Sequence, residues 1–224
     1  MSKYVIIVAG GSGSRFGSAL PKQFLPLNGV PVLIRTISRF AEADSSIHVI
    51  VVLPNDQIGN WLELCGAQSF FLTHSIVAGG QSRWQSVKNA LDSITVSEGD
   101  LIAVHDGVRP LVPVSVIVEA FRVAAKNGSA VPCVPVTDTI RQVTDGSSHI
   151  LPRRSLMAVQ TPQVFNAVDL KKAYDAPFND DFTDDASVME AAGHKITLTK
   201  GDVRNIKITH PDDLKIAEIL LKNE

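Results

Sequence analysis

Unbroken runs of apolar residues, each the length of a β-strand, recur along the chain. They cover residues 4–9, 48–53, 101–105, 129–136 and 195–199. A strand that is apolar at nearly every position has both of its faces buried. These runs therefore predict the central strands of a sheet that is covered on both sides.

Helical patterns separate the apolar runs. After Pro31, and again within residues 81–94 and 209–223, apolar side chains recur at the spacing of one helix face. Strands that alternate with helices are typical of a Rossmann-like, doubly wound α/β fold with a mainly parallel sheet. A chain of 224 residues fits one such domain, and we expect residues 1–224 to form a single unit.

Residues 137–161 interrupt this alternation. Apolar and polar residues alternate there on both sides of the turn-rich stretch TDGSS, which predicts a β-hairpin. We expect residues 137–158 to form an arm that protrudes from the domain. Such an arm commonly packs on a second subunit, so the sequence predicts a homodimer, with a flap folded on its own domain as the alternative.

Composition limits the classes of partner. Lys and Arg together number 21 against 23 for Asp and Glu, so no overall positive charge favours nucleic acid or a membrane surface. The apolar stretch before Gly10 is shorter than a signal peptide core or a membrane span, and we expect a cytoplasmic protein. Cys65 and Cys133 are isolated in the sequence, which is typical of buried free thiols.

A glycine-rich loop follows the first apolar run. Its glycines are Gly10, Gly11, Gly13 and Gly17, and Pro21 comes shortly after them. This spacing matches neither the dinucleotide fingerprint nor the P-loop, because both motifs open directly into a helix that a proline at this position would interrupt.

A loop of this kind still suits phosphate. It lies where the first strand ends, at the edge of the sheet where α/β proteins bind ligands. Glycines allow backbone N–H groups to approach an oxyanion closely, and Arg15 and Lys22 add two positive charges. The stretch therefore predicts a polyphosphate site.

The residues of this loop also resemble a known signature. AGGSGSRFG followed by PKQFLPLNG is similar to the signature of the sugar-nucleotidyltransferase superfamily, and most similar to its cytidylyltransferase branch. Six further motifs follow in the order that this branch has: GGQSRWQSV, VHDGVRP, TDT, VQTPQVF, FTDDASVME and NIKITHPDDL. Together they resemble the 2-C-methyl-D-erythritol 4-phosphate cytidylyltransferase family of the non-mevalonate isoprenoid pathway.

The resemblance implies a reaction. The family joins CTP to a polyol phosphate with release of pyrophosphate, and it uses a divalent cation such as Mg²⁺. The attacking phosphate is already largely ionised near neutral pH, so no general base is needed. Positioning of the two anions and stabilisation of the developing charge then carry the catalysis.

The resemblance also assigns roles to individual residues. The family's catalytic cations correspond to Arg15 and Lys22 at the α-phosphate and to Arg153 and Lys207 at the polyol phosphate. The residues implied around CTP are Ala9, Gly10, Gly11, Gly13, Gln81, Arg83, Ser86 and Asp106. Those implied around the polyol phosphate are Asp106, Arg109, Thr139, Arg153, Thr161 and Lys207.

Several of these assignments leave alternatives open. LPRRS replaces the family's usual V-D-R, so Arg154 competes with Arg153 for the substrate phosphate. Asp106 suits ligand hydroxyls or Mg²⁺, or it caps the following loop. Asp184 and Asp185 lie in a predicted first helical turn, where acids interact with the helix dipole. In the family, some of the residues at the polyol end reach the site from the neighbouring subunit.

Other functions fit part of the pattern. Ribitol 5-phosphate cytidylyltransferases share the fold and nearly all of the motifs. A non-catalytic CTP-binding subunit is a second alternative, although the positions of Arg15 and Lys22 retain their cations. A GTP-using nucleotidyltransferase is a third, and the downstream motifs argue against it.

Overall fold

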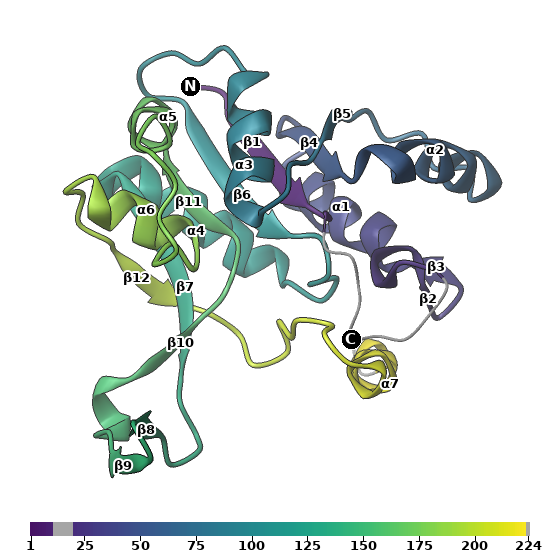
Figure 1. The fold of residues 1–224 in the computed structure, drawn as a ribbon. Coiled ribbons are helices and arrows are strands. Elements are labelled where there is room, and N and C mark those ends of the chain that lie inside the picture. The colour runs from purple at the N-terminus through teal and green to yellow at the C-terminus, as the bar shows by residue number, and fades with distance from the viewer. Residues whose placement is uncertain (11–19, 223–224) are drawn as a thin grey trace.

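The computed structural model describes residues 1–10 and 20–222 of the chain. Within them, the centre of the fold is an eight-stranded sheet (Figure 1). Its strands run in the order β10 (Met157–Val159), β7 (Ser129–Pro135), β11 (Gln163–Asn166), β6 (Leu101–Asp106), β1 (Lys3–Val8), β4 (His48–Leu53) and β5 (Ser75–Ala78), and β12 (Leu198–Lys200) pairs with β7.

The sheet is mixed but mostly parallel, which confirms the predicted α/β fold. β1 pairs in parallel with β4 and β6, and β4 pairs in parallel with β5. β11 lies between β6 and β7 and runs antiparallel to both. The apolar runs correctly located β1, β4, β6 and β7, whereas β5, β10 and β11 are too short to have been recognised.

The prediction of a central strand at residues 195–199 was wrong in position. β12 begins three residues later, at Leu198, and among the described strands it pairs with β7 alone. It lies at the margin of the sheet, where Leu198 is exposed, while Ile196 packs against the core from the preceding loop. An apolar run shows that a segment is partly buried, but it does not fix which residues form the pairing hydrogen bonds.

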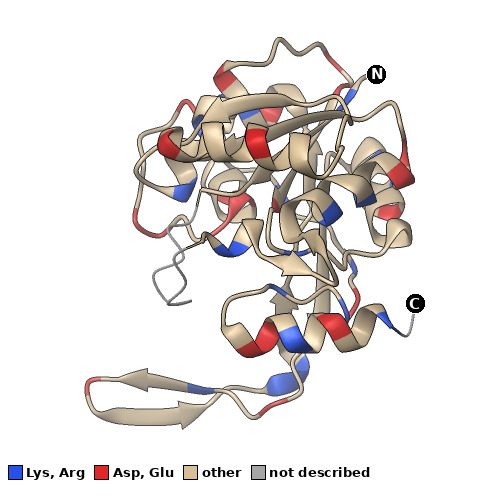
Figure 2. Cartoon of the chain, turned by 90° about the vertical axis from the view of Figure 1, so that its right-hand side faces the viewer, with Lys and Arg blue, Asp and Glu red and all other residues tan. Residues whose placement is uncertain are grey.

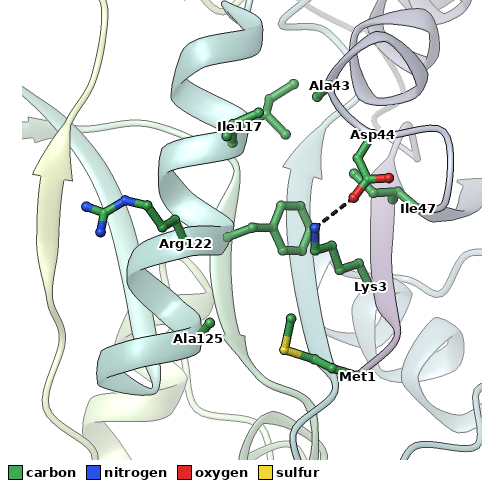
Figure 3. A pocket seen from close by; sticks show the side chains of 10 residues that line it. Met1, Lys3, Ala43, Asp44, Ile47, Ile117, Arg122 and Ala125 are labelled. Carbon is green, nitrogen blue, oxygen red and sulfur yellow. Dashed lines mark hydrogen bonds and ion pairs between the residues drawn. The ribbon is translucent and has the colours of Figure 1, made fainter.

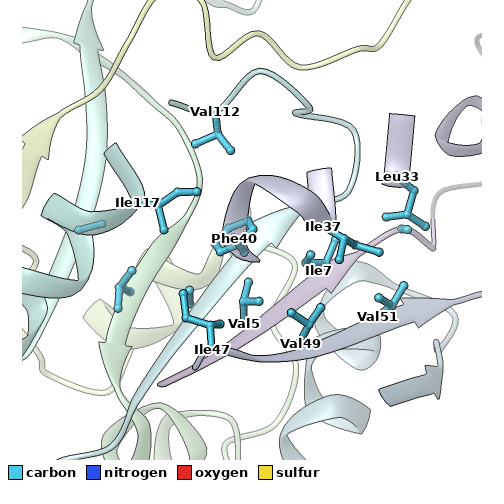
Figure 4. Packing of buried hydrophobic residues seen from close by; sticks show 14 of the residues in the cluster. Val5, Ile7, Leu33, Ile37, Phe40, Ile47, Val49, Val51, Val112 and Ile117 are labelled. Atoms are coloured by element: carbon cyan, nitrogen blue, oxygen red, sulfur yellow. The ribbon is translucent and has the colours of Figure 1, made fainter. Parts of the chain in front are cut away.

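Helices cover both faces of the sheet because the side chains of β1 alternate between two hydrophobic clusters. Val5 and Ile7 belong to the first cluster (Figure 4). Ile6, between them in the chain, belongs to the second cluster. The first cluster includes residues of α1 (Val32–Ala43), α2 (Ile58–Ala67) and α4 (Val114–Asn127). The second includes residues of α3 (Arg83–Asp92), α5 (Ala167–Ala173) and α6 (Asp185–Ala191).

The last helix, α7 (Pro211–Leu221), closes the fold beside the first half of the chain. Ala217 packs with Val108 and with Leu27, which belongs to the small hairpin of β2 (Pro26–Leu27) and β3 (Val30–Pro31). Just before α7, the backbone N–H of Ile208 donates to the carbonyl of Val108 at 2.9 Å. This contact brings the segment around residue 207 to the end of β6.

The hairpin that the sequence predicted consists of β8 (Arg141–Thr144) and β9 (Ser147–Ile150). Its turn places Asp145 at φ 44° and Gly146 at φ 79°, a left-handed pair that suits a tight hairpin turn. In Figures 1 and 2 the hairpin extends away from the body, and all of its strand residues are exposed. Its part in dimerisation stays a prediction.

The charges and thiols agree with the composition. Acidic and basic residues are interspersed over the elements (Figure 2). Cys65 and Cys133 are buried free thiols, as predicted. In the described part of the chain, no helix has the length and apolar character needed to cross a lipid bilayer.

Candidate active site

A cavity of about 460 Å³ lies where β1 and β6 end, at the carboxyl edge of the sheet. Segments from widely separated parts of the sequence form its wall. The residues that line it are Val8, Ala9, Gly10, Lys22, Gln23, Gly80, Gln81, Ser82, Arg83, Ser86, Asp106, Val108 and Lys207. The cavity therefore brings together six of the eight residues that the family resemblance implies around CTP.

Asp106, the last residue of β6, is the electrostatic centre of this cavity. Its carboxylate lies 3.1 Å from Lys207 Nζ, 3.0 Å from Arg109 Nε and 3.9 Å from Arg83 Nε. Burial alone would raise the pKa of Asp106, but Lys207, Arg83 and Arg109 hold it well below its usual range. The carboxylate is therefore ionised and fixed from several directions.

A polar network behind Asp106 joins three of the sequence motifs. Thr161 accepts the backbone N–H of Asp106 at 3.1 Å, and its hydroxyl lies 3.0 Å from His105 Nδ1. Asn205 Nδ2 donates to the Thr161 carbonyl at 2.9 Å, and the Asn205 carbonyl accepts from Arg109. Burial lowers the pKa of His105 to about 3, so this imidazole is neutral. Thr161 and Arg109 thus support Asp106 and do not line the cavity.

Part of the cavity wall is formed by the small residues Gly10, Gly80 and Ser86. The backbone N–H of Gly80 donates to Ser86 Oγ at 3.1 Å, and a β-carbon placed on Gly10 would lie 3.5 Å from the same oxygen. Gln23 Nε2 donates to the Ala9 carbonyl at 2.8 Å, which fixes the end of the first strand. A planar base needs this combination of small residues and a few hydrogen-bonding groups.

Lys22 enters the cavity from a short 3₁₀ turn, Lys22–Phe24. The turn is anchored by Phe24, which is buried and stacks on Trp61 with ring centroids 6.0 Å apart. The lysine therefore projects from a fixed base, as a residue that stabilises charge in a transition state must.

Arg83 carries an ion pair that the sequence did not reveal. Its Nη2 and Nη1 atoms lie 2.6 and 3.1 Å from the two carboxylate oxygens of Asp185. Asp184, by contrast, caps α6 through the backbone N–H of Ser187, in agreement with the predicted helix start. Asp185 does more than interact with the helix dipole, and only the separation of 102 residues hid its partner.

Two further predicted residues, Thr139 and Arg153, lie outside the cavity of this single chain. Thr139 and Arg153 are exposed residues of the arm segment, and Arg153 Nη1 donates to the Thr137 carbonyl at 2.5 Å. Gly11, Gly13 and Arg15 lie outside the described residues.

A second cavity, of about 360 Å³, lies at the other end of β1 (Figure 3). Its wall is mainly apolar, from Ile47, Ile117 and their neighbours, and its main polar contact is the Lys3–Asp44 pair at 2.7 Å. Both charges are thus already paired, and the cavity lacks the convergent cations of the first.

Comparisons with known proteins agree with the motif order. The family described as IspD, 2-C-methyl-D-erythritol 4-phosphate cytidylyltransferase, matches residues 3–223. A protein of that name from Phocaeicola vulgatus is 48% identical over 221 residues, which cover 99% of this chain and 100% of the relative.

Solved structures are similar over the same length. The 2-C-methyl-D-erythritol 4-phosphate cytidylyltransferase of Thermus thermophilus aligns with a TM-score of 0.77 and 30% identity, covering 99% of this chain and 100% of that one. The 4-diphosphocytidyl-2C-methyl-D-erythritol synthase of Anaerococcus prevotii has a TM-score of 0.83 at 24% identity, covering 99% of this chain and 96% of that one, which supports the fold alone. The family match and the identity to a full-length relative show that the chain belongs to the 2-C-methyl-D-erythritol 4-phosphate cytidylyltransferase family.

Proposed function

We propose that this chain transfers a cytidylyl group from CTP to 2-C-methyl-D-erythritol 4-phosphate. The products are 4-diphosphocytidyl-2-C-methyl-D-erythritol and pyrophosphate. The observation that carries the proposal is the cavity at the carboxyl edge of the sheet, which Lys22, Arg83 and Lys207 line together with the carboxylate of Asp106. Such a site attracts two anionic substrates and suits a reaction between them.

The reaction is an in-line displacement at the α-phosphorus of CTP. An oxygen of the polyol phosphate forms a new P–O bond while the bond to the departing pyrophosphate breaks. Lys22, together with Arg15, would stabilise the negative charge that develops on the α-phosphate. Lys207 would hold the attacking phosphate, and its pairing with Asp106 fixes its direction. The attacking phosphate is already largely ionised, so no general base is required. His105, the residue before Asp106, is buried, and burial lowers its pKa to about 3, which makes it a weak base.

Mg²⁺ fits this site as a partner of the triphosphate. Mg²⁺ is commonly bound by one or two carboxylates together with phosphate oxygens, and Asp106 supplies one such carboxylate. Among the described residues, no group of three His, Cys, Asp or Glu side chains could hold a metal ion by itself. The ion would neutralise part of the triphosphate charge. Use of CTP also supports a cytoplasmic location, where this nucleotide is made.

The central test is the substrate itself. With CTP and Mg²⁺, we expect pyrophosphate release in the presence of 2-C-methyl-D-erythritol 4-phosphate and not with ribitol 5-phosphate. Release with ribitol 5-phosphate alone would move the enzyme to the other cytidylyltransferase group. A protein that binds CTP and releases no pyrophosphate with either polyol would be a non-catalytic subunit, and release with GTP in place of CTP would change the base.

The arm is the second part of the proposal. Thr139 and Arg153 lie outside the cavity of their own chain, and Val143 and Ile150 of the hairpin are 73% and 61% exposed. A homodimer in which each arm reaches the neighbouring subunit would cover these apolar residues and deliver Arg153 to the partner's polyol phosphate.

Mixed dimers test this arrangement. We expect the Lys22→Ala variant and the Arg153→Ala variant each to be nearly inactive alone. Equal amounts of the two variant chains are then unfolded, mixed and refolded together. If the arms cross, about a quarter of the wild-type activity returns, because half of the dimers contain one intact site. If Arg153 acts within its own chain, no activity returns. Repeating the experiment with Arg154→Ala decides which arginine binds the phosphate.

A further inference from the structure

Arg83 is a cation of the cavity that a buried carboxylate holds from behind. Its guanidinium binds both carboxylate oxygens of Asp185, at 2.6 and 3.1 Å, and Asp185 is fully buried. The Tyr174 hydroxyl donates a further hydrogen bond to Asp185 Oδ1 at 2.7 Å. The Asp185 carboxylate thus accepts three hydrogen bonds, two of them from the planar guanidinium of Arg83.

The start of α6, which carries Asp185, is itself fixed to the central sheet. Asp185 is the first residue of α6, and Gln163 of β11 binds that helix start on both sides. Gln163 Nε2 donates to Asp184 Oδ2 at 2.7 Å, and Gln163 Oε1 accepts the backbone N–H of Ala186 at 2.9 Å. The hydroxyl of Tyr174 is held in turn, because its ring stacks on Trp84 with centroids 5.6 Å apart. Asp185 is therefore a fixed point from which Arg83 extends.

Arg83 lines the cavity, and its Nε lies 3.9 Å from Asp106 Oδ1. An arginine with one partner at the end of its side chain and another at Nε loses most of its rotamer freedom. The pair with Asp185 thus sets the distance between Arg83 and Asp106 before any ligand arrives.

Stability alone does not account for this pair. Taking a carboxylate and a guanidinium out of water costs nearly as much as their attraction returns, and well-packed apolar residues join two helices as firmly. Tyr174 and Trp84 already supply an aromatic contact between α3 and the end of α5. A buried ion pair at the rim of an anion site instead suits the orientation of the cation.

We propose that Asp185 is a positioning residue for CTP, which holds the guanidinium of Arg83 at the place of the triphosphate beside Asp106, and that Tyr174 fixes Asp185 in this role. The inference rests on the proposed function, because it assumes that the cavity binds CTP. Asp185 does not touch the nucleotide and acts only through Arg83.

The first experiment separates CTP from the polyol phosphate. Asp185→Asn keeps the shape of the side chain, removes its charge and is expected to raise KM for CTP about tenfold, since charge-assisted hydrogen bonds are lost. Tyr174→Phe should raise it by a smaller factor, and KM for the polyol phosphate should change little in either variant. Glu190→Gln, on the exposed part of the same helix, is the matched control and should match the wild type.

A double-mutant cycle tests whether Asp185 acts through Arg83. In a chain that already carries Arg83→Gln, the further change Asp185→Asn should leave CTP binding nearly unchanged, because nothing remains to be positioned. If Asp185→Asn weakens CTP binding by the same factor with and without Arg83→Gln, the two residues act independently and the inference is wrong. So would a fall in melting temperature for Asp185→Asn or Tyr174→Phe with no change in KM for CTP.

The outcomes also separate this inference from the proposed function. Binding of CTP with Mg²⁺ is measured directly, by equilibrium dialysis, as well as through turnover. If the wild type binds CTP and lacks turnover, the proposed reaction fails and the cycle on CTP affinity still decides the role of Asp185. If the wild type is active and the free-energy effects of the Arg83 and Asp185 changes on CTP binding simply add, the proposed function stands and the positioning role of Asp185 is wrong.

Discussion

Replacing Lys22 by alanine is expected to lower kcat for pyrophosphate release by about 10²–10³-fold, the typical loss for one charge-stabilising donor. Lys22 lines the cavity from a turn anchored in the core, so the substitution removes a fixed positive charge and leaves the fold intact. KM for CTP should rise much less than kcat falls, because the charge that Lys22 meets develops mainly in the transition state.

Steady-state kinetics on Lys22→Ala and on Lys172→Ala check this expectation. Lys172 is an exposed lysine of α5, so its replacement controls for the loss of a positive charge elsewhere on the surface. A Lys22→Ala enzyme that keeps kcat within a few-fold of the wild type would show that this lysine does not meet the reacting phosphate.

Asp106→Asn is expected to damage both stability and activity. Lys207 and Arg109 lose the charge that holds them, and Arg83 loses its second partner. We expect the free energy of unfolding to fall by about 3 kcal/mol, because Arg109, whose side chain is only 12% exposed, is left without its counter-charge. Activity should fall by about 10²-fold in kcat/KM, since small displacements of positioning groups have effects of that size.

The pH dependence of stability gives a signature for Asp106. Folding holds the pKa of Asp106 below its ordinary value of 3.8, so the ionised carboxylate stabilises the fold at every pH above that value. As the pH falls below about 4, the unfolded chain gains a proton that the folded chain resists, and this contribution is lost. Urea unfolding should therefore show a gap between the wild type and Asp106→Asn that is constant from pH 5 to pH 7 and shrinks in acid. A gap that widens in acid would contradict the assignment.

The strands show how far local pattern reaches. β1, β4, β6 and β7 are buried on both faces, so their apolar runs were visible without any partner. β11 contains Gln163 and Asn166, whose polar side chains serve α6 and α5. Its direction between β6 and β7 depends on the path of the chain through the arm, which no local pattern records.

The candidate site shows a similar division. The glycine loop and Lys22 were found because they follow a predicted strand at the ligand edge, and Asp106 was found because VHDGVRP resembles a motif of the family. Arg83 was also selected, yet its partner Asp185 was assigned to the helix dipole, because the first turn of a helix is a common place for an acid. Thr161 and Arg109, expected at the substrate, support Asp106 from behind in this chain.

The sequence by itself determined the alternation of strands and helices, the phosphate-binding edge and, through its ordered motifs, the family. These features depend on local periodicity and on residue types at short spacing. Only the tertiary structure decided which charges meet: Arg83 with Asp185, and Lys207 with Asp106. Such pairs join segments about a hundred residues apart, and their geometry is set by the packing of whole elements, which local spacing does not encode.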